Sequence, residues 1–560
     1  MIIVDLTERR LLRGSPFLFT YDEVIQLNKR TLSTLLCLLG MILLLQGGYN
    51  LAISYIASVF LLSIIVIDRS GFEVLNCQRN TCLAVVVILG LISSFACGYG
   101  SYSLAHLAPY CMLLSSSIVF TSVDDLDFKW LIGGLRYICF ISSAAAILLF
   151  FVFPSFFGYV SAGRLQAFFQ YANTAAVWFA LSFLLLLDSP LFTKIDCLVP
   201  FIALALTRSV AVALLFFFSL MIYLILENRS MASLLLTISA LVLMLCIYDM
   251  MSGRIVESVQ TFIERIIQIY DGLRLAGSSP FIGIGPGAWR QSYRFVQSAQ
   301  YSANVIHCGY LQILLDGGIF ALAAFLWFCI TRIICIFKER SNIPHSSFVV
   351  TGIVLMLLHF MVDIDIQFAF IDLLLVLFLS RGNKKYSIKE LPFGFPNWAN
   401  KGCLLLCLSI IFGLTTITCY RSYLIEVGDR GPSCFEKDPE VTENYLLRLC
   451  DEGEYASVVD AADSLRLRSE PSELQLLKIG SLYCMDMRDD AEECLLELID
   501  MQKKNVDLYK TATAYFDYYG ISNEGRIRLT RIENQANEMI ERPPASYLRN
   551  QVLYEWTQLN

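Results

Sequence analysis

Long apolar runs separated by short polar segments recur between residues 31 and 420, and they restrict the fold more than any other feature of this sequence. A membrane-spanning helix needs roughly 17–25 consecutive, mostly apolar residues. Because lipid offers the backbone no hydrogen-bond partners, such segments must bond internally, as helices do. Apolar residues fill 56% of the 560 positions, and the mean hydropathy is +0.60. The sequence therefore predicts an all-α polytopic membrane protein.

The apolar runs and the charges between them predict a topology. The runs lie near 31–47, 51–67, 82–98, 104–120, 131–153, 172–188, 196–206, 209–226, 232–249, 308–331, 347–362, 366–380 and 402–420. Basic residues favour the cytoplasmic loops of membrane proteins, and here they alternate from loop to loop if residues 1–30 form a cytoplasmic segment. We therefore expect about 12–13 transmembrane helices in the cytoplasmic membrane, with the long loop 250–306 and the tail 421–560 outside.

The tail differs in composition from the rest of the chain. Residues 421–560 carry 16 basic and 27 acidic residues, a balance of −11, whereas the other 420 residues carry 26 and 22, a balance of +4. An acidic module argues against a nucleic-acid partner. Glu454-Tyr455-Ala456 recurs in outline as Asp489-Asp490-Ala491, 35 residues later, which is close to the tetratricopeptide period. We expect a soluble, helical, TPR-like domain; because most signature positions of that repeat are missing, a generic helical bundle is the alternative.

Arginines gather in the segments that this topology places outside, where basic residues are normally scarce. Two lie at outer helix ends and five in the long loop, namely Arg164, Arg208, Arg254, Arg265, Arg274, Arg290 and Arg294. The guanidinium group offers a rigid fork of donors that matches phosphate oxygens. The cluster therefore predicts an anionic ligand, for which a lipid diphosphate is the natural candidate at a membrane surface. The alternative is that these arginines extend to lipid headgroups.

Residues 279–289 supply the most specific motif, SPFIGIGPGAW, which includes Gly283, Gly285 and Trp289. His307 follows, at the start of an apolar helix that carries Asp316-Gly317. This arrangement resembles the O-antigen ligase and Wzy-type O-antigen polymerase superfamily. Elements upstream and downstream extend the resemblance over about 160–380, namely Arg164 with Asn173, Arg208, and His359 with Asp363 and Asp365. Cys308, where the family usually has Asn, and Asp316, where Glu is commoner, depart from the pattern.

The resemblance implies a GT-C-like, inverting glycosyltransferase that uses an undecaprenyl-diphosphate-linked glycan and needs no metal or other cofactor. Such a reaction requires a base for the acceptor hydroxyl and positive charge for the departing diphosphate. His307 suits the first role, because an unperturbed imidazole has a pKa near ~6.5 and is largely neutral at pH 7. By resemblance, Arg208 and Arg265 hold the diphosphate, with Arg164 as a third candidate.

The remaining motif residues are assigned supporting roles. His359 and Asp363 are four residues apart on one helix face, so an orienting hydrogen bond is possible; with Asp365 they offer catalytic support or cation ligands as alternatives. No strand precedes the glycine run, which excludes a dinucleotide fingerprint. Gly283 and Gly285 either let backbone amides approach a phosphate or form an ordinary turn.

These observations predict two domains, a transmembrane glycosyltransferase at 31–420 and a soluble tail at 421–560. The predicted function is transfer or polymerisation of glycan at the outer face of the membrane. The acceptor is a glycan, lipid or protein, recruited by the tail, and the other partners are membrane lipids. A Wzy-type polymerase and a protein O-oligosaccharyltransferase are alternatives within the class. A polysaccharide flippase is the alternative from another class, although the internal repeats expected of a transporter are not evident.

Overall fold

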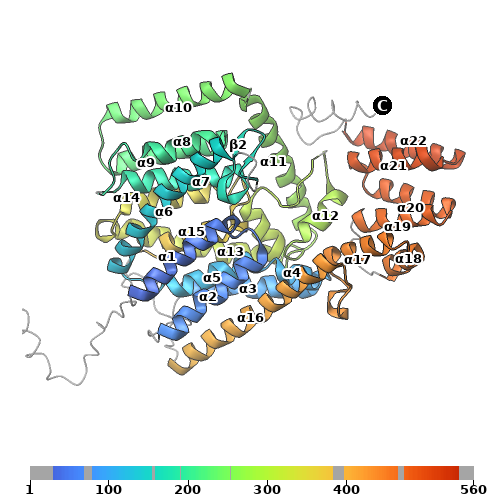
Figure 1. The fold of residues 1–560 in the computed structure, drawn as a ribbon, viewed down its shortest axis with the longest axis horizontal. Helices are drawn as coiled ribbons and strands as arrows, with labels where there is room; N and C mark the ends of the chain where they lie inside the picture. The colour runs from blue at the N-terminus through green and yellow to red at the C-terminus, as the bar shows by residue number, and fades with distance from the viewer. Residues whose placement is uncertain are drawn as a thin grey trace, which may run out of the picture.

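The computed structural model describes residues 29–68, 78–153, 158–189, 191–252, 254–299, 301–381, 397–464 and 472–540. A large bundle of helices occupies one side of Figure 1, and a smaller stack formed by the C-terminal helices lies at the other side. Most of the predicted cytoplasmic segment 1–30 falls outside the described residues.

The predicted apolar runs all lie in helices. Their bounds are α1 (Lys29–Leu44), α2 (Leu51–Asp68), α3 (Gln78–Cys97), α4 (Ser101–Ala105), α5 (Ala108–Phe120), α6 (Asp125–Val152), α7 (Ala172–Leu187), α8 (Leu198–Thr207), α9 (Val210–Leu226), α10 (Met231–Ser252), α13 (Gly309–Lys338), α14 (Ser346–His359), α15 (Ala369–Leu379) and α16 (Asn397–Val427). Within the described residues, 5 segments are long and apolar enough to cross a membrane, and further apolar helices have 10–17 residues. The all-α polytopic fold is thus confirmed, while several predicted spans are short helices.

Two helices form the centre of the bundle. All of α5 and all of α15 is buried, and the two helices contact each other. Apart from Asp372 in α15 and three serines in α5, both are apolar on all faces, which is the pattern of a fully buried helix. Exposed large side chains lie instead on peripheral helices, as with Ile141, Trp327 and Phe412. Many large apolar side chains on the outer surface are expected of a bundle whose surroundings are lipid.

Loops that the charge pattern assigns to the cytoplasm meet at one end of the bundle. Arg332 donates to the carbonyl oxygens of Leu379 and Arg381, and Arg381 donates to those of Val123 and Asp124. These contacts tie α13, the end of α15 and the α5–α6 turn together. The assignment of this end to the cytoplasm remains a prediction.

The predicted loop 250–306 is largely helical, which corrects that part of the prediction. It contains α11 (Arg254–Ala276) and α12 (Ala288–Val296). Apolar residues in α11 recur every three or four positions, which is helical spacing. The buried face of α11 carries polar side chains, including Arg265, Gln268 and Asp271, while its exposed face carries Phe262 and Leu273. This helix therefore directs polar groups toward the protein interior.

Within its described residues, the tail continues from α16 as six α-helices. They are α17 (Pro439–Asp451), α18 (Tyr455–Ser464), α19 (Ser472–Cys484), α20 (Arg488–Met501), α21 (Val506–Tyr519) and α22 (Asn523–Ile540). Alternate helices begin 33 and 34 residues apart (439 to 472, then 472 to 506). The tail is helical as expected, and its likeness to tetratricopeptide repeats remains a proposal.

The tail is attached to the membrane bundle through ion pairs. Arg290 pairs with Glu440, and Arg294 lies 3.3 Å from Glu473. Lys504 of the tail donates to the backbone carbonyl of Ser298, at 3.0 Å. Two of the outer arginines therefore bind tail carboxylates, and they do not join the arginines predicted to hold a diphosphate.

Candidate active site

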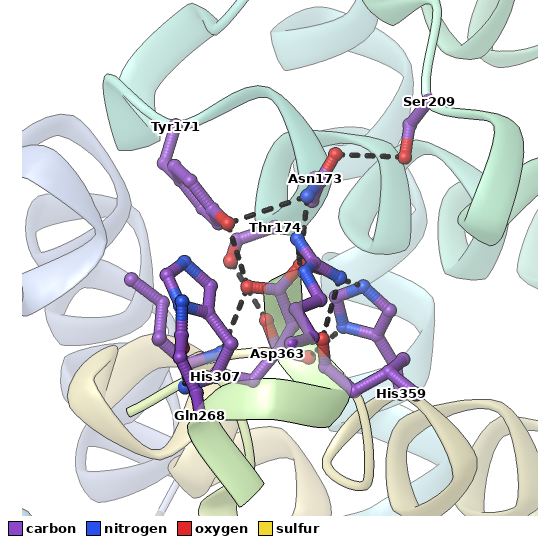
Figure 2. Close-up of polar contacts among 12 residues, drawn as sticks. Tyr171, Asn173, Thr174, Ser209, Gln268, His307, His359 and Asp363 are labelled. Carbon is purple, nitrogen blue, oxygen red and sulfur yellow. Dashed lines mark hydrogen bonds and ion pairs between the residues drawn. The ribbon is translucent and has the colours of Figure 1, made fainter. Parts of the chain in front are cut away.

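Asp363 is the centre of a buried polar network just after α14 (Figure 2). One carboxylate oxygen accepts a hydrogen bond from the Tyr171 hydroxyl at 2.6 Å and from the backbone amide of Ile364 at 2.9 Å. The other accepts from the Asn173 amide at 2.7 Å and from Arg265 at 3.1 Å. Asp363 is fully buried, and a buried carboxylate is tolerated only with partners of this kind.

A short hairpin positions Arg164. Strands β1 (Val160–Ser161) and β2 (Arg164–Leu165) pair in an antiparallel manner, and the two turn residues between them have positive φ angles, as in a two-residue hairpin turn. Arg164 donates to the Thr207 carbonyl at 3.0 Å and to the Asn173 side-chain oxygen at 2.9 Å. Asn173 thereby links Arg164 to Asp363.

Arg208 lies at the break between α8 and α9. It ends α8 in the left-handed conformation, with φ 51°, which is an uncommon backbone state for a residue other than glycine. The next residue, Ser209, donates to the Asn173 side-chain oxygen at 2.9 Å. The break thus holds the backbone of Arg208 next to the same network that contains Arg164.

Arg265 approaches Asp363 from α11. In addition to its 3.1 Å bond to Asp363, it donates to the Val362 carbonyl at 2.5 Å, and its side chain is 9% exposed. Burial opposes ionisation of Asp363, but Arg265, His359 and His307 outweigh burial and hold its pKa well below the ordinary value. Asp363 is therefore ionised, and it keeps the guanidinium of Arg265 in place.

His307 precedes α13 and lies beside Gln268 of α11 (Figure 2). Its Nδ1 atom is 2.9 Å from the side-chain oxygen of Gln268, which also accepts the backbone N–H of His307 at 3.3 Å. Burial lowers the pKa of His307, Asp363 raises it, and Arg265 lowers it; the net effect is a pKa below the ordinary value. The imidazole is therefore neutral at pH 7, which is the state that a general base requires.

His359 is the last residue of α14 and lies between two carboxylates. Its Nδ1 atom is 2.5 Å from Asp365, and its Nε2 atom is 3.5 Å from Asp363. Asp365 also accepts a hydrogen bond from Thr174 at 2.7 Å. In the part of the chain that the structure describes, no group of three or more acidic, His or Cys side chains has an arrangement suited to a metal ion. His359 thus lies beside Asp363 and Asp365, and the orienting role of these residues stays a prediction.

The glycine motif supports the fold near the site without facing the arginines. Ile284 donates to the Leu315 carbonyl at 2.7 Å, and a Cβ atom on Gly283, whose φ is +84°, would lie 2.5 Å from that same carbonyl. A Cβ atom on Gly285 would lie 2.6 Å from Cys97. These contacts show close packing of Gly283 against α13 and of Gly285 against α3, and both readings of the glycines stay predictions.

Trp289, like these glycines, makes packing contacts within the protein. It is buried, donates to the Ala303 carbonyl at 2.9 Å and stacks on Tyr293, with ring centroids 5.5 Å apart. Tyr301, which stacks on Tyr293 in turn, donates to Asp271 of α11 at 3.0 Å. Trp289 therefore supports the helix that carries Arg265.

The structure thus brings Arg164, Arg208, Arg265 and His307 to one end of the bundle, around Asp363. Sequence reasoning did not identify Gln268, Tyr171 and Thr174 as members of this site. Gln268 carried a usable signal, because it follows Arg265 by three residues and three residues separate neighbours on one helix face. Tyr171 and Thr174 flank Asn173 but gave no comparable signal.

Residues 197–326 match a family model described as O-antigen ligase. The match includes Arg208, Arg265 and His307, while Arg164 and Asp363 lie outside it. A comparison with curated proteins finds no match.

Proposed function

We propose that this chain, whose residues 197–326 match a family model described as O-antigen ligase, transfers glycan from an undecaprenyl-diphosphate-linked donor to an acceptor at the outer face of the cytoplasmic membrane. The observation that carries the proposal is the position of a neutral, half-buried imidazole, His307, beside an arginine network. A membrane role in glycan transfer agrees with the family domain and with the apolar helices.

The arginines suit a diphosphate leaving group. As the bond between the anomeric carbon and the phosphate oxygen breaks, negative charge grows on that oxygen, and fixed cationic donors stabilise it. Arg265 is held by Asp363, and Arg164 is held by Asn173 and Thr207. Donors whose positions are already fixed need no reorganisation as charge develops. Arg208, at the break between α8 and α9, is the third member of this proposed clamp.

His307 is the proposed base. The acceptor hydroxyl gives its proton to the imidazole while its oxygen forms the new glycosidic bond, and the diphosphate leaves from the opposite face with inversion. In this scheme the arginines carry the leaving-group charge, and no metal ion has to do so. General-base catalysis of this kind contributes roughly 10²–10⁴ to the rate.

The acceptor defines the alternatives within the class. A ligase joins a finished glycan to a different acceptor, a polymerase joins two lipid-linked glycans, and an oligosaccharyltransferase modifies a protein. The tail lies at the end of α16 and is bound to α12 through Arg290 and Arg294. We assign the tail the role of presenting an acceptor, because stacked helical hairpins form extended binding surfaces.

The proposal is tested with purified protein in nanodiscs and a short undecaprenyl-diphosphate-linked glycan. The expected result is release of undecaprenyl diphosphate together with a new glycosidic product, with the same rate in the presence of EDTA. Donor movement across a liposome bilayer without any new bond would instead indicate a flippase. In cells that lack the gene, accumulated full-length polymer indicates a ligase, whereas accumulated single repeat units indicate a polymerase.

A further inference from the structure

Gln268 receives no role from the family match or from the proposed reaction, yet its side chain contacts the proposed base directly. Its side chain is buried, and it lies one helical turn after Arg265 on the polar face of α11. Its side-chain oxygen is 3.3 Å from the backbone nitrogen of His307 and 2.9 Å from Nδ1 of the same residue. One amide oxygen therefore faces both a backbone donor and the imidazole ring.

The backbone contact determines which way the Gln268 amide points. A backbone N–H can only donate, so the Gln268 atom that faces it must be the oxygen. With the amide turned over, its NH₂ group would meet the backbone N–H, and two donors would oppose each other in a buried site. Such an unsatisfied buried group costs about 1–3 kcal/mol. The oxygen orientation is therefore the stable one.

The imidazole tautomer follows from this orientation. Because an amide oxygen only accepts, Nδ1 of His307 must carry a proton in order to bond to it. A neutral imidazole has one N–H, so Nε2 then holds a lone pair. From this geometry we propose that Gln268 is a positioning residue, which keeps His307 in the tautomer whose Nε2 atom accepts the acceptor's proton. This inference rests on the proposed function in assigning His307 as the base.

The surrounding charges allow the tautomer to be tested through the pH dependence of the reaction. The charged groups that act on His307 are Asp363, in the turn after α14, and Arg265 on α11. Gln268 adds a neutral acceptor. Glu at position 268 would keep an acceptor oxygen in the same place but add a negative charge, which favours the imidazolium form. Leu would remove the acceptor while keeping a similar volume.

The test uses the full-length protein in nanodiscs, labelled with ¹⁵N-histidine. The chain contains 4 histidines, so the resonance that disappears in His307→Asn identifies His307. We expect the wild-type imidazole at pH 8 to carry its proton on Nδ1, and we expect Gln268→Leu to populate the Nε2-protonated form. Gln268→Glu should keep the Nδ1 proton and raise the pKa of His307. Gln291→Leu, which removes a buried glutamine from α12, is the matched control and should leave the spectrum of His307 unchanged.

Kinetics provide the second measurement. Gln268→Leu should lower kcat about 10- to 100-fold, since a misplaced catalytic group typically costs this much, with donor Kd unchanged. Gln268→Glu should recover much of the rate at high pH and shift the acidic limb of the pH–rate profile upward. A wild-type imidazole protonated on Nε2, or an unchanged tautomer in Gln268→Leu, would overturn the assignment. If the spectra agree but no variant transfers glycan, the proposed function fails while the tautomer assignment stands.

Discussion

Two buried carboxylates each form an ion pair with an arginine. One is Asp363 in the membrane bundle, and the other is Asp438 at the start of the tail. Asp363 lies 3.1 Å from Arg265, and Asp438 lies 2.7 Å from Arg421; both aspartates are fully buried. Both pairs consist of an aspartate and an arginine. Their surroundings differ, and this difference separates a candidate site from an ion pair with a structural role.

The pair of Asp438 and Arg421 is surrounded by structural contacts. Asp438 caps α17 by accepting from the backbone amides of Glu440 and Val441, and it also accepts from Ser101 at 2.8 Å. Arg421 contacts both Asp438 and Glu440. Every one of these contacts is a capping or docking interaction of the kind that fixes a helix start. The pair therefore holds α17 against α16 and α4.

The pair of Asp363 and Arg265 has polar atoms near it that lack a hydrogen-bond partner. Within the described chain, Nε of Arg265 and Nε2 of His359 are buried nitrogens without a hydrogen-bond partner. Buried polar groups are normally satisfied, and exceptions often mark functional sites. The groups around Asp363 also come from three separate segments: Tyr171 and Asn173 at the start of α7, Arg265 on α11, and His359 at the end of α14. Polar groups that come from distant segments, some of them without a hydrogen-bond partner, are typical of a site that binds a further group.

The largest predicted contrast comes from removing each arginine. Arg265→Ala should weaken donor binding and lower turnover together, and it leaves a buried carboxylate unpaired, at a cost of about 3–5 kcal/mol in stability. Arg421→Ala should incur a similar stability cost without changing donor affinity. Donor Kd and thermal unfolding are measured for both variants. Arg265→Met combined with Asp363→Asn removes both charges and should restore stability but not donor binding. Recovery of donor affinity in that double variant would contradict a role for Arg265 in the clamp.

Asp363→Asn should move the pH dependence of turnover. Asp363 raises the pKa of His307, so its neutralisation lowers that pKa further. A base acts when it is deprotonated, and the acidic limb of the wild-type profile should therefore lie below ~pH 6.5. In Asp363→Asn the limb should move to still lower pH, with a lower plateau because Arg265 is less firmly held. If the acidic limb instead moves to higher pH in Asp363→Asn, a group other than His307 controls the pH dependence.

Asp438→Asn should affect the tail and spare the chemistry. The neutral side chain can still cap α17, but it loses the ion pair with Arg421, and a buried hydrogen bond to a charged group is worth about 1.5–3 kcal/mol. We expect faster proteolytic cleavage near the junction of α16 and α17, with turnover on a small soluble acceptor within about twofold of wild type. Loss of turnover equal to that of an Arg265 variant would remove the distinction between the two pairs.

Arg294→Ala should have the smallest effect. Arg294 and Glu473 form a pair whose side chains are 24% and 46% exposed, and exposed pairs contribute about 0–1 kcal/mol. Turnover and the melting temperature should be nearly unchanged, and salt should not alter the difference from wild type. A large loss of donor binding would return Arg294 to the group of diphosphate ligands.

Sequence patterns predicted the helices because helix formation follows from local rules, and the apolar runs predicted the bundle. Arg164, Arg208, Arg265 and His307 were named from a resemblance; the structure places them near one another, and their roles stay predictions. Gln268 could be recognised as a neighbour of Arg265 on one helix face, but its contact with His307 could not be derived, because that contact joins segments 39 residues apart. The sequence pattern also treated Arg290 and Arg294 as members of one cluster, since charge alone does not reveal that tail carboxylates neutralise them.

The α11 helix shows a second limit. Because its segment has fewer consecutive apolar residues than a membrane span, the sequence predicts a loop there. Its amphipathic spacing was present in the sequence, with Phe262 and Leu273 on the face opposite Gln268 and Asp271. The spacing alone does not indicate which face is buried, and the buried face carries Arg265, Gln268 and Asp271 together with Ile267.

Single-turnover rate and donor affinity of His307→Ala, measured beside His106→Ala, decide whether His307 is the base. His106 is the matched control, a half-buried histidine that contacts Tyr102 and not the arginine network. The predicted result is a loss of about 10²–10⁴ in the transfer rate for His307→Ala, with donor Kd within a few-fold of wild type and with His106→Ala active. A transfer rate for His307→Ala close to that of wild type would contradict the proposed mechanism.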